Sequence, residues 1–111
     1  MTEHVSLDEL QEARDAGQKV VDVRNHDEYS AGHVPGAHLM PLADLPRRTG
    51  ELPRDRPVFI VCQKGGRSTE AAALLRAAGV DARPVDGGTD GWARTGRPLE
   101  FGEAPGRKGH A

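Results

Sequence analysis

The single cysteine of this chain, Cys62, stands where a reactive thiol is expected. It follows the largely apolar residues 57–61 and precedes the glycine-containing residues 63–68, after which a helix-like stretch begins at Thr69. A strand that leads through a glycine loop into a helix forms an anion site, because free N–H groups and the positive dipole end of the helix face the loop. A thiol placed there is held largely as the nucleophilic thiolate near neutral pH. Cys62 is therefore the candidate catalytic residue.

The residues that follow Cys62 suit a small anionic substrate. Gly65 and Gly66 let the backbone curl closely, and Lys64 and Arg67 supply two cations in a chain whose net charge is −2. We expect Lys64 to bind the substrate, whereas Arg67 could bind it or turn toward a neighbouring carboxylate. The expected substrate-binding loop consists of Gln63, Lys64, Gly65, Gly66, Arg67 and Ser68, and the last of these could cap the helix or donate to the loop.

Length and composition limit the classes of protein that fit. The 111 residues suffice for one domain with a single core. The cations are scattered rather than clustered, which gives no footprint for nucleic acid. One cysteine cannot form an intrachain disulfide. No apolar stretch approaches the roughly 20 residues of a membrane span, and the N-terminus lacks the pattern of a signal peptide. These features predict a cytoplasmic protein with no nucleic-acid or membrane partner.

Apolar periodicity and turn residues predict alternating helices and strands. A first helix is expected after Ser6, which forms a capping box with Glu9, and it ends near Gly17. Strands are expected at 19–23, 37–40, 58–61 and 83–85, and the run at 58–61 is typical of a central parallel strand. Helical turns are expected at 28–31 and 42–45. A longer helix is expected to begin at 69 and to end at Gly79, and a final short helix is expected to carry Trp92 as a core anchor.

This alternation predicts an α/β fold with a mostly parallel central sheet of about five short strands and helices on both faces. Ligands of such sheets bind beyond the carboxyl ends of the strands, where Cys62 lies. Residues 1–101 are expected to form the domain. Residues 102–111 have no apolar face and are expected to form a disordered tail.

Two charged residues, Asp22 and Arg24, end the strand expected beside the Cys62 strand. We expect them to support the loop rather than to react, with Arg24 and Glu28 as a plausible ion pair. The spacing of the nearby histidines matches no ordinary zinc pattern, and we expect neither a metal nor a cofactor; these histidines are His26, His33 and His38.

Four motifs together resemble those of the single-domain rhodanese family, which are thiosulfate-type sulfurtransferases. They are residues 21–24 (VDVR) followed by 27–29 (DEY), residues 32–37 (GHVPGA), residues 62–68 (CQKGGRS), and Gly87 and Gly88 with Trp92. The motifs occur in the order and spacing of that family and extend over about residues 5–98.

The resemblance implies a two-step sulfur transfer through Cys62. The thiolate would attack the outer sulfur of thiosulfate or a similar small anionic donor and expel sulfite. Cys62 would then carry the sulfur as a persulfide and yield it to a thiol, cyanide or protein acceptor. A curled glycine loop suits this chemistry, because several N–H groups can surround the partly anionic outer sulfur.

Two other functions remain open at this stage. One is a sulfur-relay or protein-binding rhodanese module with little thiosulfate turnover. The other is a cysteine-dependent phosphatase or arsenate reductase. Related phosphatases place the loop arginine one position further from the cysteine than Arg67 stands from Cys62, because a tetrahedral phosphate needs a wider ring. The shorter loop favours a single sulfur atom.

Overall fold

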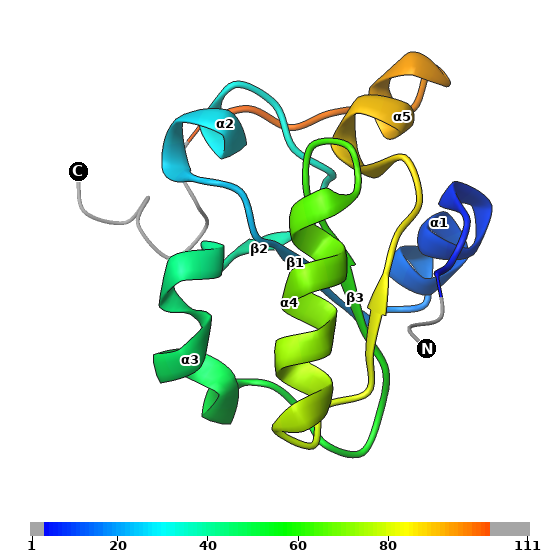
Figure 1. Cartoon of the computed structure of the whole chain (residues 1–111). Coiled ribbons are helices and arrows are strands. Elements are labelled where there is room, and N and C mark those ends of the chain that lie inside the picture. The colour runs from blue at the N-terminus through cyan, green and yellow to red at the C-terminus, as the bar shows by residue number, and fades with distance from the viewer. Residues whose placement is uncertain (1–3, 103–111) are drawn as a thin grey trace.

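A parallel sheet forms the centre of the molecule in the computed structural model, which describes residues 4–102 (Figure 1). Its four strands lie in the order β2-β1-β3-β4. They are β1 (Lys19–Asp22), β2 (His38–Leu39), β3 (Val58–Val61) and β4 (Ala82–Pro84). Val5 adds a single parallel bridge to Val85 beyond β4. The predicted α/β fold with a parallel sheet is confirmed.

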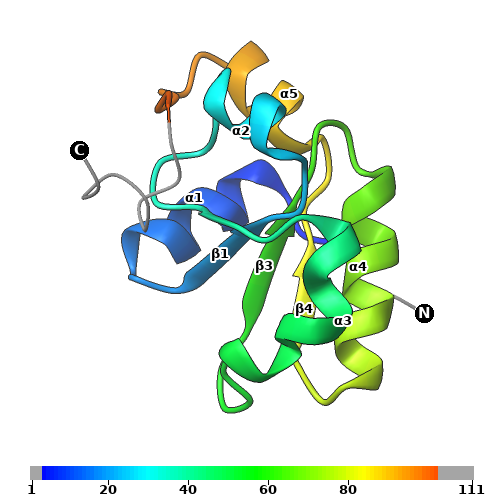
Figure 2. The same cartoon turned by 90° about the vertical axis from the view of Figure 1, so that its left-hand side faces the viewer.

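Helices cover both faces of this sheet, as predicted (Figure 2). One face carries α3 (Leu45–Arg48) and α4 (Gly66–Ala77), and the other carries α1 (Leu7–Asp15). The short helices α2 (His26–Ser30) and α5 (Gly88–Arg94) lie near the carboxyl ends of the strands. Two 3₁₀ helices, Leu42–Asp44 and Thr49–Glu51, flank α3.

Each face of the sheet packs its own apolar cluster. Val21 and Ile60 point to the side of α4, where they meet buried residues of that helix such as Leu75. Phe59 and Trp92 belong to the cluster on the side of α1 and α5. Trp92 is 1% exposed, which confirms it as a core anchor. Burying side chains on both faces of a strand explains the continuous apolar run at β3.

Side-chain caps explain where two helices begin. The Ser6 hydroxyl accepts from the Glu9 N–H at 3.1 Å, and the Glu9 carboxylate accepts from the Ser6 N–H at 2.9 Å, which confirms the predicted capping box. A second capping box joins Asn25 and Glu28, and it starts α2 at His26, two residues before the predicted turn. The helix predicted from Thr69 starts at Gly66 instead, inside the glycine loop.

The order of the strands places two carboxyl ends side by side at the centre of the sheet. The chain runs from β1 outward to β2, then returns across β1 to β3 and β4. Asp22 at the end of β1 therefore pairs in register with Val61 at the end of β3. A crevice at such a reversal of strand order is the usual ligand site of an open α/β sheet.

The C-terminal part of the described chain passes over the end of α2. Glu100 forms an antiparallel bridge with His33, and Gly102 donates its N–H to the Ser30 carbonyl at 2.9 Å. The rest of the predicted tail, 103–111, lies outside the described residues. No helix among residues 4–102 is long and apolar enough to cross a membrane.

Candidate active site

Cys62 follows the last residue of β3 and lies in the crevice at the centre of the sheet. Its side chain is directed among the loop residues, and the Gly65 N–H donates to its sulfur at 3.0 Å. The residue is only 1% exposed and packs against the apolar cluster beneath α4. The thiol is therefore held inside a closed loop, in contact with a backbone N–H.

The first turn of α5 holds the start of the loop. The Thr89 N–H donates to the Cys62 carbonyl at 2.8 Å, and the Asp90 N–H donates to the Gln63 carbonyl at 2.9 Å. Gly88 makes this approach possible: a Cβ at that position would lie 2.5 Å from the Cys62 oxygen. Its φ of 57° is also in the left-handed region that favours glycine.

Two hydroxyls hold the other end of the loop. Ser68 and Thr69 donate to the Gly65 carbonyl at 3.0 and 2.9 Å. The N-cap residue of α4 is Gly65, which has no side chain to cap the helix. Of the two roles open to Ser68, the structure therefore shows donation to the loop. Ser68 is fully buried, so this hydroxyl is used inside the protein.

These anchored carbonyls determine the direction of the loop N–H groups. In a trans peptide the C=O and the following N–H point in opposite directions, and no residue described has a cis bond. The carbonyls of Cys62, Gln63 and Gly65 face α5 or the first turn of α4. The N–H groups of Gln63, Lys64 and Gly66 therefore face away from those partners.

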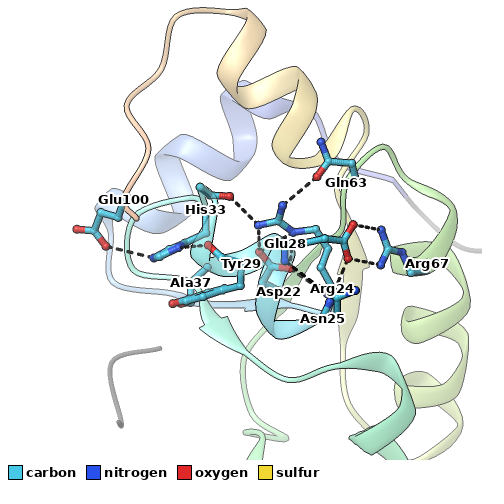
Figure 3. Close-up of polar contacts among 11 residues, drawn as sticks. Asp22, Arg24, Asn25, Glu28, Tyr29, His33, Ala37, Gln63, Arg67 and Glu100 are labelled. Atoms are coloured by element: carbon cyan, nitrogen blue, oxygen red, sulfur yellow. Dashed lines mark hydrogen bonds and ion pairs between the residues drawn. The ribbon is translucent and has the colours of Figure 1, made fainter. Parts of the chain in front are cut away.

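Arg67 is engaged by a carboxylate rather than left open to the loop. Its two terminal nitrogens bind the two Glu28 oxygens at 2.7 and 2.9 Å (Figure 3). This hydrogen-bonded pair lowers the pKa of Glu28 from 4.5 to about 2 and raises the pKa of Arg67. The predicted pairing of Glu28 with Arg24 is wrong, because Glu28 lies within reach of the helix that carries Arg67.

Arg24 forms a buried network with Asp22 and the loop (Figure 3). Its guanidinium binds the Asp22 carboxylate, with a closest contact of 2.8 Å, and donates to the Gln63 side-chain oxygen at 2.9 Å. A further bond goes to the Gly32 carbonyl at 2.9 Å. Both side chains of the ion pair are almost fully buried, at 3% and 0% exposed. The network joins the end of β1 to the residue after Cys62.

Lys64 points outward beside α5. It is exposed and forms no ion pair among the described residues. It borders a hollow of about 530 Å³ together with Arg94 and Asp90 of α5. Arg94 is ion-paired with Asp90 at 3.4 Å, so Lys64 is the unpaired cation on this side of the loop among the described residues.

The histidines of the described chain gather no metal site. His33 is buried and stacks on Tyr29, with ring centroids 3.6 Å apart. Burial raises the pKa of Tyr29 to about 12, and its hydroxyl donates to the Ala37 carbonyl at 2.7 Å. No group of three or more potential metal ligands occurs among residues 4–102.

A family model for the rhodanese-like domain matches residues 6–95, which is most of the chain. The chain belongs to the rhodanese-like family. The match extends over both halves of the crevice, from Asp22 to the helix that carries Trp92.

Known rhodanese-like structures share this fold. A rhodanese-related protein from Thermoplasma volcanium superimposes with a TM-score of 0.83 at 27% identity, over 89% of this chain and 98% of that one. A rhodanese-like domain protein from Staphylococcus aureus gives a TM-score of 0.80 at 31% identity, over 90% of this chain and 98% of that one.

Similar sequences occur both in short and in longer proteins. A sulfurtransferase from Allochromatium vinosum is 38% identical over 72% of this chain and 76% of its own length. An HTH-type transcriptional regulator, Rv0324, from Mycobacterium tuberculosis is 38% identical over 85% of this chain. The chain spans only 43% of the length of that regulator.

Sequence reasoning missed one residue of this rhodanese site, Thr89, and gave another, Glu28, the wrong partner. Thr89 anchors the Cys62 carbonyl, and Glu28 holds Arg67. Glu28 stands three residues after Asn25, which is the spacing of a capping box and the signal that could have placed it at a helix start. No local pattern in the sequence brings Thr89 to Cys62, because that contact joins residues far apart in the chain.

Proposed function

We propose that the protein is a sulfurtransferase in which Cys62 accepts a sulfur atom as a persulfide. The observation that supports this proposal best is the Gly65 N–H at 3.0 Å from the Cys62 sulfur. The carbonyls of Cys62 and Gln63 are bound by α5, and that of Gly65 is bound by Ser68 and Thr69. Such a loop leaves N–H groups for a further anionic atom beyond the cysteine sulfur. The sulfurtransferase of Allochromatium vinosum, 38% identical, supports the same activity.

In the first half-reaction the Cys62 thiolate attacks the outer sulfur of thiosulfate. A bond forms between the two sulfur atoms, and the bond to the sulfonate sulfur breaks with its electron pair. Sulfite leaves as a dianion, and the enzyme keeps the transferred sulfur as a singly charged persulfide. We propose that the N–H groups of Gln63, Lys64 and Gly66 face this outer sulfur, since their carbonyl partners lie on the opposite side.

In the second half-reaction a thiophilic acceptor attacks the outer sulfur. The bond between the Cys62 sulfur and the outer sulfur breaks, and Cys62 leaves as a thiolate. With cyanide the product is thiocyanate, and with a thiolate it is a new persulfide. No external oxidant or reductant is needed. In each step one nucleophile takes the outer sulfur, and the group that held it leaves with the electron pair of the broken bond.

Charge favours an approach of the donor from the side of Lys64. Arg67 uses both terminal nitrogens on Glu28, whereas Lys64 has no ion-pair partner among the described residues. Thiosulfate is a dianion, so a cation beside the loop favours its approach. We propose that Lys64 contributes to donor binding and that Arg67 contributes to the structure of the loop.

Sulfur relay to a partner protein is the second candidate function. It is favoured by relatives in which this domain is part of a longer protein, such as the probable adenylyltransferase/sulfurtransferase MoeZ of Mycobacterium tuberculosis. That protein is 37% identical over 81% of this chain, which spans 24% of its length. A relay would load Cys62 with sulfur but turn over thiosulfate and cyanide slowly.

The experiment that tests the proposed function measures thiocyanate formed from thiosulfate and cyanide. The parent protein is expected to produce it, and Cys62→Ser is expected to lose the activity. Undiminished activity in the serine variant would refute the role of Cys62. Loading of Cys62 with little thiocyanate production would favour the relay.

A further inference from the structure

A second hollow, of about 270 Å³, borders the loop at Gln63. Gln63 of the loop and Thr89 of α5 both border it, and its apolar wall comes from Ala31, Ala93 and Leu99. Its charged lining residues, Arg24, Glu28 and Asp90, are each held in an ion pair. Gln63 follows Cys62 directly in the chain, so the hollow adjoins the proposed reaction site. It is large enough for a small organic molecule rather than a single atom.

The side-chain amide of Gln63 is fixed in one orientation at this hollow. Arg24 has only donors, so its 2.9 Å bond to Gln63 identifies the Gln63 atom as the oxygen. The amide nitrogen is therefore turned away from Arg24, as Figure 3 shows. That nitrogen has no hydrogen-bond partner among residues 4–102. It presents two N–H groups of known direction, held by a buried ion pair.

The hydroxyl of Thr89, which borders the same hollow, has no hydrogen-bond partner among the described residues. Thr89 is 4% exposed. Among residues 4–102, its hydroxyl is the one buried side-chain polar atom without a hydrogen-bond partner. Buried polar groups are nearly always paired, so this hydroxyl is an exception on the wall of the hollow. This hydroxyl belongs to a residue that borders the same hollow as Gln63.

We propose that this hollow binds the sulfur acceptor and that the acceptor is a small organic thiol carrying an amide carbonyl, as cysteine derivatives do. The carbonyl oxygen accepts from the Gln63 amide, and the methylene chain packs on Ala31, Ala93 and Leu99. The acceptor thiolate then approaches the outer sulfur in line with the Cys62 sulfur, from the position that sulfite leaves, while its amide group lies beside Gln63. The proposal rests on the sulfurtransferase function proposed above.

The transfer to such a thiol balances without another reagent. The acceptor thiolate attacks the outer sulfur of the Cys62 persulfide and forms a sulfur–sulfur bond to it. The Cys62 bond to that sulfur breaks, and Cys62 leaves as a thiolate. The product is the persulfide of the acceptor, which carries the negative charge that the acceptor brought.

The test compares two acceptors of the same shape. One is 3-mercaptopropionamide, and the other is 3-methylbutane-1-thiol, which replaces the amide by a branched hydrocarbon. For each, kcat/KM is measured with thiosulfate as donor, and their ratio is compared between the parent protein and variants. Comparing ratios cancels the difference in intrinsic reactivity between the two thiols.

Two substitutions of Gln63 separate hydrogen bonding from support of the loop. Gln63→Glu keeps an oxygen for Arg24 but removes the N–H donors, whereas Gln63→Leu removes both. We expect each to lower the ratio about tenfold, since a polar ligand group would lose its partner. If the ratio of the two kcat/KM values is unchanged in Gln63→Glu, the proposal is overturned. This holds even if Gln63→Leu lowers the ratio, because the effect then comes from loss of the contact with Arg24.

Intact-mass measurement keeps this proposal distinct from the proposed function. Thiosulfate is expected to add one sulfur atom to the parent protein, and 3-mercaptopropionamide is expected to remove it. Failure to load in the parent would refute sulfur transfer itself. The parent could instead take up sulfur and transfer it equally well to both thiols, with the same kcat/KM ratio in the parent and the variants. That result would refute only the acceptor site.

Discussion

Arg67 binds Glu28 through two parallel hydrogen bonds, with nitrogen–oxygen distances of 2.7 and 2.9 Å. The pair joins the first turn of α4 to α2. The pair occupies the Arg67 guanidinium, which the sequence alone could also assign to the substrate. This is why Lys64 is the loop cation that we propose for the donor. The same pair makes part of the stability of this region dependent on pH.

Acid is expected to weaken the fold through Glu28. Its pKa is about 2 in the folded protein against 4.5 ordinarily, because Arg67 stabilises the carboxylate. The resulting stability is complete above pH 4.5 and is lost as the pH falls through about 2. After allowance for solvent screening we expect a contribution of about 1 kcal/mol. Urea unfolding of Glu28→Gln should therefore show a smaller loss between pH 5 and pH 2 than the parent.

Glu12→Gln is the matched control for this measurement. Glu12 is an exposed residue of α1 without an ion pair among the described residues. Its substitution should leave the acid dependence of the free energy of unfolding close to that of the parent. A parent and a Glu28→Gln variant with the same acid dependence would contradict the assigned pair.

Gly88→Ala is expected to destabilise the protein by about 3 kcal/mol or more. The new Cβ would lie 2.5 Å from the Cys62 carbonyl oxygen, and alanine is strained at a φ of 57°. Gly96→Ala isolates the strain, because Gly96 has a φ of 81° but no atom within 4 Å of a built Cβ. That control should cost only about 1 kcal/mol in urea unfolding. Equal losses in the two variants would show that the contact with Cys62 is not tight.

Thr89→Val is expected to raise the melting temperature of the unliganded protein. Valine has nearly the same shape and removes a buried hydroxyl that lacks a partner among the described residues. The gain should be about 1 kcal/mol. Thr95→Val is the comparison, because the Thr95 hydroxyl donates to the Gly91 and Trp92 carbonyls. A lowered melting temperature for Thr89→Val would mean that this hydroxyl is hydrogen-bonded in solution.

Lys64→Ala is expected to raise KM for thiosulfate about fivefold with a smaller effect on kcat, since Lys64 supplies charge for binding. Lys19→Ala removes a cation at the opposite end of the sheet, at the start of β1. It should change KM much less. Steady-state kinetics at low ionic strength would reveal the difference, and an unchanged KM for Lys64→Ala would place Lys64 outside the donor site.

The elements that sequence predicted well are those with strong local patterns. The apolar run of β3 and the Ser6–Glu9 capping box carry their own signals, because burial and capping depend on neighbouring residues. The start of α4 was placed too late, because glycines at 65 and 66 are poor helix formers in isolation. In the folded chain, Ser68 and Thr69 bind the Gly65 carbonyl and extend the helix to Gly66.

The site was predictable in its loop and not in its long-range partners. The type and spacing of residues 62–68 identify an anion loop next to a thiol. The partners of Arg24 and Arg67 depend instead on which strand ends and helices are neighbours in space. Asp22 lies next to Val61 only because the strand order reverses between β1 and β3, and that order is not written in local sequence.

The central claim is that Cys62 carries a transferred sulfur atom, and intact-mass spectrometry after exposure to thiosulfate tests it most directly. The parent protein, purified without reductant, is expected to gain the mass of one sulfur atom and to lose it on addition of cyanide, whereas Cys62→Ser gains nothing. A parent that gains no mass, or a serine variant that gains the same mass, would contradict the account.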